Sequence, residues 1–393
     1  MSEIILCSKD ACTGCFACQG ICPKHAISQV KDDEGFRHPE INKEVCIACH
    51  LCERVCPVLN PIKKNLKGDV YAAWSLDENI RTKSSSGGIF SELAICVLRQ
   101  GGVVVGASMD NNGYVHHTII SDINELNSHR GSKYVQSMID GDVYRELRKI
   151  LLDGRKVLFT GCPCQVAGAR SIFKDDENLY TVDIVCHGVP SPEAFAKVYY
   201  EIKCQYPNLV SYNFRKLDSW GVCSSVNINI NINNILTNLP LTGKLTFYQD
   251  AFLKGLMHRP NCYSCNYATI ERVGDVTLAD FWGVGSYKPI SDNHKGGCSM
   301  LSVNSVKGKM LFNEIKERIY FDERDIQETI QGGNEQIVRA SAIPEMRNTF
   351  YVDLYSHSIE QLISKYGLKT IEPVSLVHQV VNLVKNKILR ILR

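Results

Sequence analysis

The sequence contains no run of about 18 consecutive apolar residues, which is the least that a transmembrane helix needs. Its opening stretch, MSEIILCSKD, lacks the basic n-region and apolar h-region of a secretory signal. Lysine and arginine number 44 against 42 aspartates and glutamates, so no global charge indicates a nucleic-acid partner. We therefore expect a cytoplasmic protein that does not span a membrane.

Cysteine, by contrast, is abundant, with 18 residues in the chain of 393. In a protein that is not secreted, so many cysteines indicate metal or redox chemistry rather than a disulfide framework. The length is sufficient for two or three domains with a core in each, and 44% hydrophobic residues is ordinary for a globular protein.

Two segments share the spacing C-x2-C-x2-C-x3-C-P, namely CTGCFACQGICP at 12–23 and CIACHLCERVCP at 46–57. This spacing is typical of ferredoxins with two 4Fe–4S clusters, in which three cysteines of a run bind one cluster and the fourth binds the other. We expect one cluster at Cys12, Cys15, Cys18 and Cys56, and the other at Cys46, Cys49, Cys52 and Cys22. The offset of 34 residues between the runs indicates an internal repeat.

A pair of structural zinc sites is the alternative, because zinc proteins also use C-x2-C pairs. The doubled run of four cysteines followed by proline is the more specific pattern, and it favours iron–sulfur clusters. Cys7 lies outside both runs in the apolar stretch IILC, and we expect it to be a buried strand residue rather than a ligand.

Beyond the two runs, residues 61–69 are basic and contain Pro61, which is typical of a linker. Strand-like segments then alternate with amphipathic helical segments, which predicts an α/β body with at least some parallel strands. The predicted strands are residues 71–77, 101–110, 156–161, 180–186 and 274–282. The predicted helices are residues 86–100, 142–154 and 192–205.

A serine–glycine segment precedes the first of these helices, with the residues Ser84, Ser85, Ser86, Gly87 and Gly88. The glycines would leave backbone N–H groups free at the positive end of the helix, and the serines add hydroxyl donors, so the segment suits a phosphate group. The alternative is a capped helix without a ligand. Lys133, in the segment GSKYVQS, is a second candidate, and its alternative interpretation is a solvated surface charge.

Five further cysteines of the body come in close-set groups: Cys162 and Cys164 in GCPCQ, Cys186 in VCHG, and Cys262 and Cys265 in NCYSC. Two of the groups follow predicted strands, where α/β sheets place functional loops. A third iron–sulfur cluster, a zinc site and a dithiol redox centre are the alternatives. Five cysteines are one more than four ligands, so the sequence leaves the ligand set open, and we favour a cluster.

Six stretches in this order resemble the coenzyme F420 hydrogenase/dehydrogenase beta-subunit family. They are SSSGGIFSELA, GSKYVQS, LFTGCPCQVAG, DIVCHGVPSP, NCYSC with GDVTLADFWG, and KGGCSMLSVNSVKG. The resemblance covers about residues 70–310. It implies an FAD-binding body, one further 4Fe–4S cluster at the body cysteines and hydride exchange with a deazaflavin. It also implies that the serine–glycine segment and Lys133 contact the flavin.

The expected fold is an α+β ferredoxin-type module followed by a larger α/β flavin-binding body and a C-terminal helical tail. The expected parts are the two-cluster module at 1–60, the linker at 61–69, two family-like regions at 70–150 and 151–320, and the tail at 321–393.

The leading interpretation of function is an iron–sulfur flavoprotein oxidoreductase that passes electrons between an F420-like coenzyme or ferredoxin, FAD and 4Fe–4S clusters. Flavin suits this task because it exchanges two electrons with a hydride donor and single electrons with a cluster. One alternative is a ferredoxin-driven reductase of a disulfide or a carbohydrate intermediate. Another is a non-catalytic subunit that transfers electrons to a partner protein. The expected partners are a redox protein or a small hydride donor.

The last segment, residues 373–393, repeats apolar residues at steps of three and four among basic ones, which predicts an amphipathic helix. We expect it either to pack on the body or a second subunit, or to lie at the inner membrane face on anionic lipid.

Overall fold

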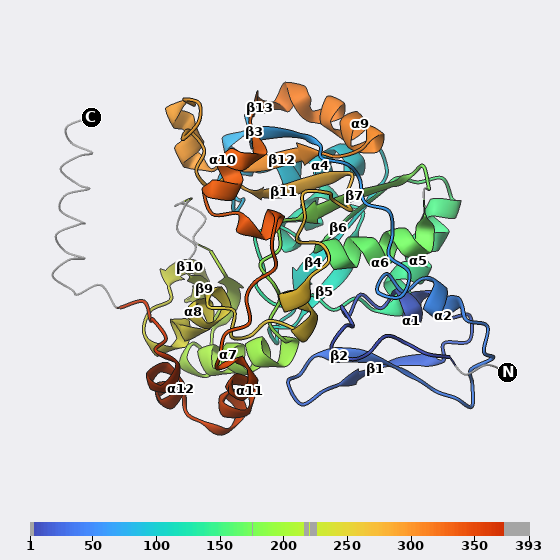
Figure 1. Ribbon diagram of the computed structural model, residues 1–393. Coiled ribbons are helices and arrows are strands. Elements are labelled where there is room, and N and C mark those ends of the chain that lie inside the picture. Colours follow the sequence, from blue (N-terminus) through green and yellow to red (C-terminus); the bar gives the residue numbers. More distant parts are fainter. Residues whose placement is uncertain (1–3, 175, 216–219, 221–225, 373–393) are drawn as a thin grey trace.

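The computed structural model describes residues 4–174, 176–215, 220 and 226–372. Figure 1 shows its parts: a large sheet with helices on both faces, a small hairpin near the N-terminus, and a second small sheet with several helices beside it. Within the described residues no helix is long and apolar enough to cross a membrane. The amphipathic helix expected at 373–393 lies outside the described residues.

The N-terminal module contains one antiparallel hairpin and two short helices. Its elements are α1 (Ala17–Ile21), β1 (Ile27–Lys31), β2 (Arg37–Ile41) and α2 (Leu51–Arg54). The internal repeat expected from the sequence is present in the backbone. Gly14 and Ala48 both have positive φ, and so do Phe16 and His50, each pair being 34 residues apart. Each run of cysteines therefore makes the same tight loop and then enters a helix.

The body is built on an eight-stranded mixed sheet in the order β13-β3-β12-β11-β7-β6-β4-β5. The strands are β3 (Asp69–Ser75), β4 (Val103–Met109), β5 (Val115–Ile120), β6 (Val157–Gly161), β7 (Leu179–Ile184), β11 (Val276–Asp280), β12 (Ser299–Val303) and β13 (Ile319–Glu323). Neighbours β4, β6, β7 and β11 pair in parallel, and the other neighbours are antiparallel.

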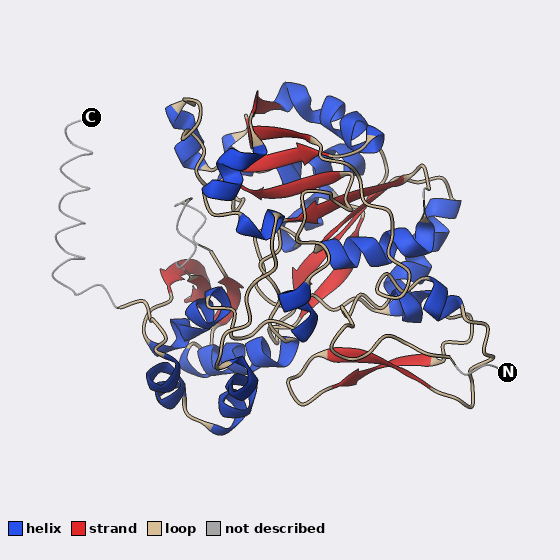
Figure 2. Ribbon diagram, in the orientation of Figure 1, coloured by secondary structure: helices blue, strands red, loops and turns tan. Residues whose placement is uncertain are grey.

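Helices cover both faces of this sheet (Figure 2). α4 (Ile89–Arg99) and α9 (Val306–Ile315) pack on one face with Val104 and Leu158, whereas α5 (Gly141–Leu152) and α6 (Pro163–Phe173) pack on the other with Val105 and Phe159. Because successive strand residues point to opposite faces, both faces need apolar side chains, and the central strands are accordingly mainly hydrophobic.

A second group of helices and strands begins with α7 (Pro192–Gln205). It holds a three-stranded antiparallel sheet, β10-β9-β8, formed by β8 (Leu209–Asn213), β9 (Asn227–Ile232) and β10 (Ile235–Pro240). Its other α-helices are α8 (Phe247–Leu253), α11 (Arg347–Ser356) and α12 (Ile359–Tyr366). The short helices α3 (Glu78–Thr82) and α10 (Ile326–Gln331) lie elsewhere in the body. The 3-10 turns are η1 (Ile123–Ser128), η2 (Lys244–Thr246), η3 (Pro260–Ser264), η4 (Asp292–Gly296), η5 (Lys316–Arg318) and η6 (Glu335–Ile337).

The mixed α/β body is confirmed, and all five predicted strands and all three predicted helices occur within a few residues of their expected ends. The helical tail is present in part: α10, α11 and α12 fall within it, but β13 overlaps its start and adds an edge strand to the sheet.

The module shares its core with the body. Phe36 of the module is fully buried among residues of α7, α8 and α11, and Cys15, Ala17 and Val55 pack with residues of α5 and α6. Asn65, in the segment expected to be a linker, pairs with Arg272 of the body through its backbone. Module and body are therefore joined by buried side chains as well as by the chain itself.

Candidate functional site

The segments that the sequence singled out converge at one edge of the main sheet. β3, β4, β6, β7 and β11 all run in the same direction, because β3 and β11 are both antiparallel to β12 and the others pair in parallel with β11 or with one another. The serine–glycine segment follows β3, Cys162 follows β6 and Cys186 follows β7. Ligands of open α/β sheets bind at this carboxyl edge.

In the module, the cysteines expected to hold the first cluster lie together. Cys12, Cys15, Cys18 and Cys56 are each at most 9% exposed. Burial raises the pKa of Cys15 to about 12, and the charges of Cys12 and Cys56 add to the rise. Because Cys12 and Cys56 belong to different runs, the fourth cysteine of the second run reaches the first group, as the crosswise grouping requires. We call these four residues the inner set.

The cysteines expected to hold the second cluster also lie together. Cys22, Cys46, Cys49 and Cys52 line one cavity, with isoleucines and leucine between them. Burial raises the pKa of Cys52 to about 11. Cys22, Cys46 and Cys49 are only partly buried, so these four residues lie nearer to solvent than the inner set. We call them the outer set.

The expectation that Cys7 is a buried strand residue was wrong. Cys7 belongs to no strand and is only partly buried. Contact with the thiols of Cys12 and Cys56 raises its pKa above the ordinary value, with burial adding to the rise. An apolar run of three residues before a cysteine resembles the start of a strand, but here the chain passes over the inner set instead of joining a sheet.

The five cysteines of the body form a single group at the carboxyl edge. The Sγ atoms of Cys162 and Cys186 are 3.6 Å apart. Burial raises the pKa of Cys164, and the charges of Cys186, Cys265 and Cys262 add to the effect. Two neighbouring strand ends and the η3 turn thus deliver all five thiols to one place. We call them the body set.

The donor chemistry of these three sets fits iron–sulfur clusters, because each offers at least four thiols. Within the described residues, no three or more His, Cys, Asp or Glu side chains surround a position for one metal ion. Burial raises the pKa of Cys15, Cys18, Cys164 and Cys262, and bound iron would supply the positive charge that stabilises a thiolate.

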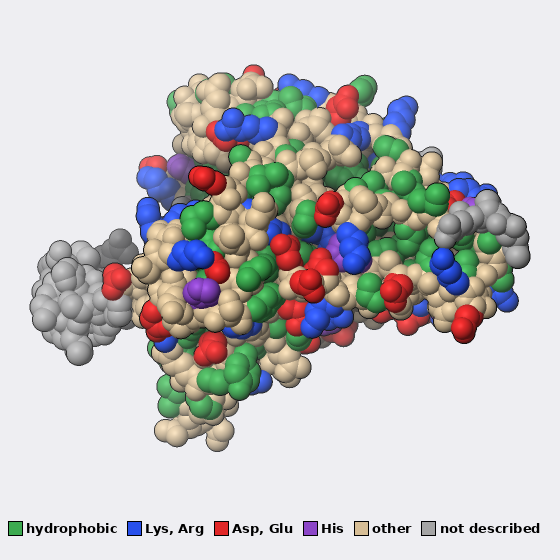
Figure 3. Space-filling view, turned by 60° about the horizontal axis from the view of Figure 1, so that its bottom comes forward, with side chains coloured by type: hydrophobic (Ala, Val, Ile, Leu, Met, Phe, Trp, Pro, Cys, Tyr) green, Lys and Arg blue, Asp and Glu red, His purple; other side chains and the backbone are tan. Residues whose placement is uncertain are grey.

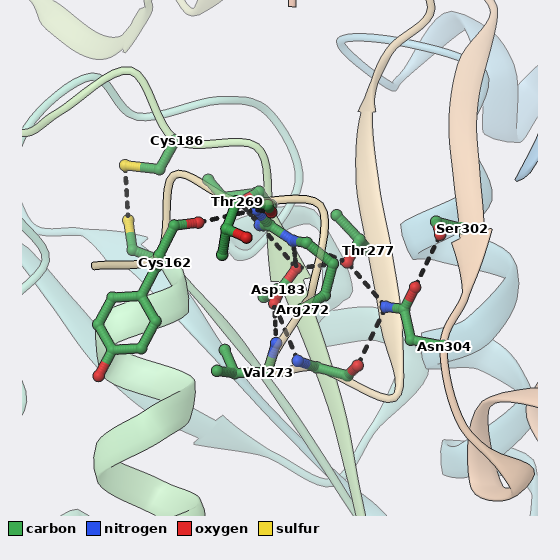
Figure 4. Close-up of polar contacts among 12 residues, drawn as sticks. Cys162, Asp183, Cys186, Thr269, Arg272, Val273, Thr277, Ser302 and Asn304 are labelled. Atoms are coloured by element: carbon green, nitrogen blue, oxygen red, sulfur yellow. Dashed lines mark hydrogen bonds and ion pairs between the residues drawn. The ribbon is translucent and has the colours of Figure 1, made fainter. Parts of the chain in front are cut away.

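A buried ion pair fixes the loops of the body set (Figure 4). Arg272 Nη2 donates to Asp183 Oδ1 at 3.0 Å and to the carbonyl of Ile184 at 2.9 Å, and its Nη1 donates to the carbonyl of Tyr267 at 3.1 Å. Asp183 also accepts from Thr277 and from the backbone N–H groups after Arg272. The pair therefore ties the end of β7, three residues before Cys186, to the segment that follows Cys265.

The inner set and the body set are neighbours. α6, which begins beside Cys162, packs on Cys15: a Cβ placed at Gly168 would lie 3.0 Å from Cys15 Sγ. Tyr144 donates its hydroxyl to the carbonyl of Cys15 at 2.7 Å. Burial raises the pKa of Tyr267, and the charges of Cys164 and Cys15 add to the rise, so thiols of both sets act on this one side chain.

The serine–glycine segment is closely packed, and the expectation that its glycine N–H groups are free was wrong for Gly87. The N–H of Gly87 is not free, because it donates to Ser299 Oγ at 2.9 Å, and a Cβ at this position would lie 2.3 Å from the carbonyl oxygen of Ala73. Ser86 and Ser84 donate to backbone carbonyls. Gly88, at φ 87°, is the residue that precedes α4. Position 87 therefore has room only for glycine, because the sheet lies against it.

Ser85 and Lys133, two flavin candidates 48 residues apart, lie on adjoining loops. The N–H of Ser132 donates to Ser85 Oγ at 2.9 Å. Lys133 Nζ donates to the carbonyls of Ser128 and Arg130, and burial lowers the pKa of Lys133 to about 7. Lys133 is thus no ordinary solvated surface charge.

An open groove between the module and α7 involves none of the candidate residues. It runs between the β1–β2 turn and α7 and is lined by tyrosines, lysines and carboxylates, among them Tyr114, Tyr199, Lys197 and Glu193. In the space-filling view of this side, acidic and basic side chains lie close together rather than in separate areas of one sign (Figure 3). The cysteine sets therefore remain the main candidate site.

Comparison with known families agrees with this geometry. The family model described as "4Fe-4S dicluster domain" matches residues 11–60. The models for the N-terminal and C-terminal parts of the coenzyme F420 hydrogenase/dehydrogenase beta subunit match residues 70–141 and 154–329, which together are more than half of the chain. The chain belongs to the coenzyme F420 hydrogenase/dehydrogenase beta-subunit family. The resemblance seen in the sequence is confirmed, and this family member has a 4Fe–4S dicluster domain at its N-terminus.

Two further comparisons complete the description of this family member. No curated protein matches the chain. Among solved structures, a chain of the F420-reducing [NiFe] hydrogenase complex from Methanosarcina barkeri matches with a TM-score of 0.45 and 16% identity, over 78% of this chain and 94% of that chain.

Sequence reasoning missed the charged residues that hold the site of this family member together. Arg259 and Arg272 flank the NCYSC pair, and Asp183 precedes Cys186. All three are at most 4% exposed. The available signal was their position, because each lies within seven residues of a candidate cysteine.

Proposed function

We propose that this chain is an iron–sulfur flavoprotein oxidoreductase that passes electrons between a hydride-carrying coenzyme of the F420 type, or a ferredoxin, and 4Fe–4S clusters by way of FAD. The observation that carries the proposal is the convergence of three groups of cysteines, eight in the module and five at the carboxyl edge of the body sheet. Membership of the family supports the class of reaction.

The three sets follow one another through the molecule, with the buried inner set between the outer set and the body set. The outer set is partly exposed, the inner set is buried against α6, and the body set begins at the N-terminus of α6. Each cluster would exchange one electron at a time. The protein contributes fixed positions: Tyr144 and Gly168 hold Cys15 against α6, and Arg272 and Asp183 hold the loops of the body set.

FAD would lie at the same carboxyl edge, near Ser85, Gly88 and Lys133. Ser85 retains a hydroxyl hydrogen to donate, since its oxygen accepts from Ser132, and Lys133 supplies a cation. Both groups suit a pyrophosphate. The role of the protein is to position the cofactor, which supplies the hydride chemistry itself.

A second candidate function rests on the contact between Cys162 and Cys186. Two thiols 3.6 Å apart are close enough to form a disulfide with a small movement. As a ferredoxin-driven disulfide reductase, the pair would become a disulfide as it reduces a substrate disulfide to two thiols, and two electrons and two protons would restore it. Once Cys162 and Cys186 are joined in a disulfide, they would be unable to ligate a cluster.

The experiment is an anaerobic assay of the purified full chain. Bound flavin is measured first, and then the reduction of a viologen dye by reduced F420 is followed with and without Cys164→Ala. The proposed function predicts bound FAD and dye reduction that the substitution abolishes. Reduction only after a partner protein is added would identify an electron-carrying subunit instead. Reduction of a disulfide substrate by reduced ferredoxin that is unaffected by Cys164→Ala but abolished by Cys162→Ala would favour the disulfide reductase.

A further inference from the structure

Arg259 is a guanidinium that is buried between the module and the body. It lies between α8 and the NCYSC pair and is 1% exposed. Its Nε donates to the carbonyl of Cys12 at 2.7 Å, and its Nη1 donates to Gln136 Oε1 at 3.1 Å. Nη2 donates to the carbonyl of Arg37 at 3.0 Å and contacts the His38 ring. The guanidinium also lies over the ring of Phe36.

Every one of these partners is neutral or a ring nitrogen. Among the described residues no carboxylate forms an ion pair with Arg259. Asp32 Oδ2 lies 2.8 Å from His38 Nε2, so this carboxylate feels the charge of Arg259 across the ring without forming an ion pair with the guanidinium. Burying a cation without an anion is costly, and native proteins pair such a charge or neutralise it. Arginine stays charged in proteins, so a nearby negative charge is expected.

Besides Asp32, which acts only across the His38 ring, the cysteine sets are the source of that charge. The side chain of Arg259 donates to Cys12, and its backbone carbonyl accepts from the N–H of Cys262 at 2.8 Å. The charge of Arg259 acts on the thiols of both Cys12 and Cys262. Gly14, whose N–H points to Cys12 Sγ at 3.4 Å, leaves just enough room for the guanidinium: a Cβ there would lie 3.1 Å from Nη1.

We propose that Arg259 is the fixed counter-charge of the iron–sulfur cluster at the inner set and holds its reduction potential high relative to that of the outer set. The proposal rests on the proposed function, which places a cluster at Cys12, Cys15, Cys18 and Cys56. Net charge is one of the determinants of cluster potential. A reduced cluster is more negative by one electron, so a buried cation beside it stabilises the reduced form more than the oxidised form.

This assignment also gives electron transfer through the module a direction. Among the described residues, the cations shown beside the outer set are exposed: Arg54 donates to the carbonyl of Cys49, and Lys24 lines the same cavity. Water screens an exposed charge and weakens its effect on potential. Electrons entering at the outer set would therefore move downhill to the inner set, towards the body.

The test is a redox titration of the anaerobically reconstituted full chain, followed by electron paramagnetic resonance. Arg259→Gln removes the charge and keeps a hydrogen-bonding side chain. The matched control is Arg347→Gln, because Arg347 is also buried at the junction of module and body but has a carboxylate partner in Glu34 at 2.6 Å. Iron per chain is measured for each protein.

The expected result is that Arg259→Gln shifts one module cluster to a more negative potential and leaves the other in place, whereas Arg347→Gln shifts neither. Equal potentials in Arg259→Gln and the wild type, with iron retained, would overturn the proposal. If Arg259→Gln does not retain the cluster, Arg259→Lys is measured instead, because it keeps the positive charge. A cluster potential near that of the wild type supports the counter-charge. A cluster potential well below that of the wild type contradicts it. A wild type without module clusters would instead refute the proposed function.

Discussion

Gly168 of α6 lies directly against Cys15, so closely that a Cβ at residue 168 would stand 3.0 Å from Cys15 Sγ and 2.9 Å from its Cβ. Alanine favours a helix over glycine by about 1 kcal/mol, but overpacking of a buried contact costs about 1–3 kcal/mol. We predict that Gly168→Ala lowers stability and alters the resonance signal of the inner cluster alone. A more stable protein with an unchanged signal would show that α6 does not bear on Cys15.

The ion pair of Asp183 and Arg272 leads to a prediction about stability. Arg272→Met leaves a buried carboxylate without its partner, which costs about 3–5 kcal/mol. Adding Asp183→Asn to this variant removes the unpaired negative charge, so the double variant should be more stable than Arg272→Met alone. Denaturant titration under anaerobic conditions measures both. Lys149→Met, which breaks an exposed pair with Glu146, is the control and should cost less than about 1 kcal/mol.

The pKa of Lys133 predicts how flavin binding depends on pH. Burial lowers that pKa to about 7, so the free protein loses this proton as the pH rises through neutrality. A phosphate binds the protonated form better, and affinity for FAD should therefore be full below about pH 7 and fall above it by at most about tenfold per pH unit. Lys133→Arg keeps the charge at all these values and should bind with a flat profile. Equilibrium titrations with FAD test this, and identical profiles would exclude Lys133 from the phosphate site.

Ser85 and Ser84 make a matched pair of variants. Ser85 accepts from the N–H of Ser132 and can donate to a ligand, whereas Ser84 already donates to the carbonyl of Ile80 at 2.7 Å. A hydrogen bond to a charged group contributes about 1.5–3 kcal/mol, so Ser85→Ala should weaken FAD binding by about tenfold or more. Ser84→Ala should bind as the wild type does. Equal losses in the two variants would indicate a general disturbance of the loop.

Much of the fold follows from local patterns in the sequence. The strands β3, β4, β6, β7 and β11 are mainly apolar because both faces of the sheet are covered, and such runs are recognisable without a structure. The antiparallel additions β5, β12 and β13 were missed. They carry histidine, serine, aspartate or glutamate within short segments such as VHHTII and IYFDE, and their strand character comes from pairing with a neighbour.

The candidate site was recognised through its cysteines and not through its charges. Spacing alone groups Cys22 with the run at 46–52, because the fourth cysteine of a run cannot reach the cluster of its own loop. No comparable rule links Arg259 to Cys12, which are 247 residues apart and meet only when the module packs on the body. The same holds for Gly87, whose engaged N–H depends on Ser299 in a distant strand.

The central claim is that the three cysteine sets hold iron–sulfur clusters, and metal analysis of the anaerobically purified full chain tests it most directly. The account predicts about twelve iron atoms per chain, four for each set, together with Cys164→Ala retaining about eight in the module. A wild type that also holds about eight, unchanged by Cys164→Ala, would remove the body cluster. A chain that binds zinc in place of iron would contradict the account as a whole.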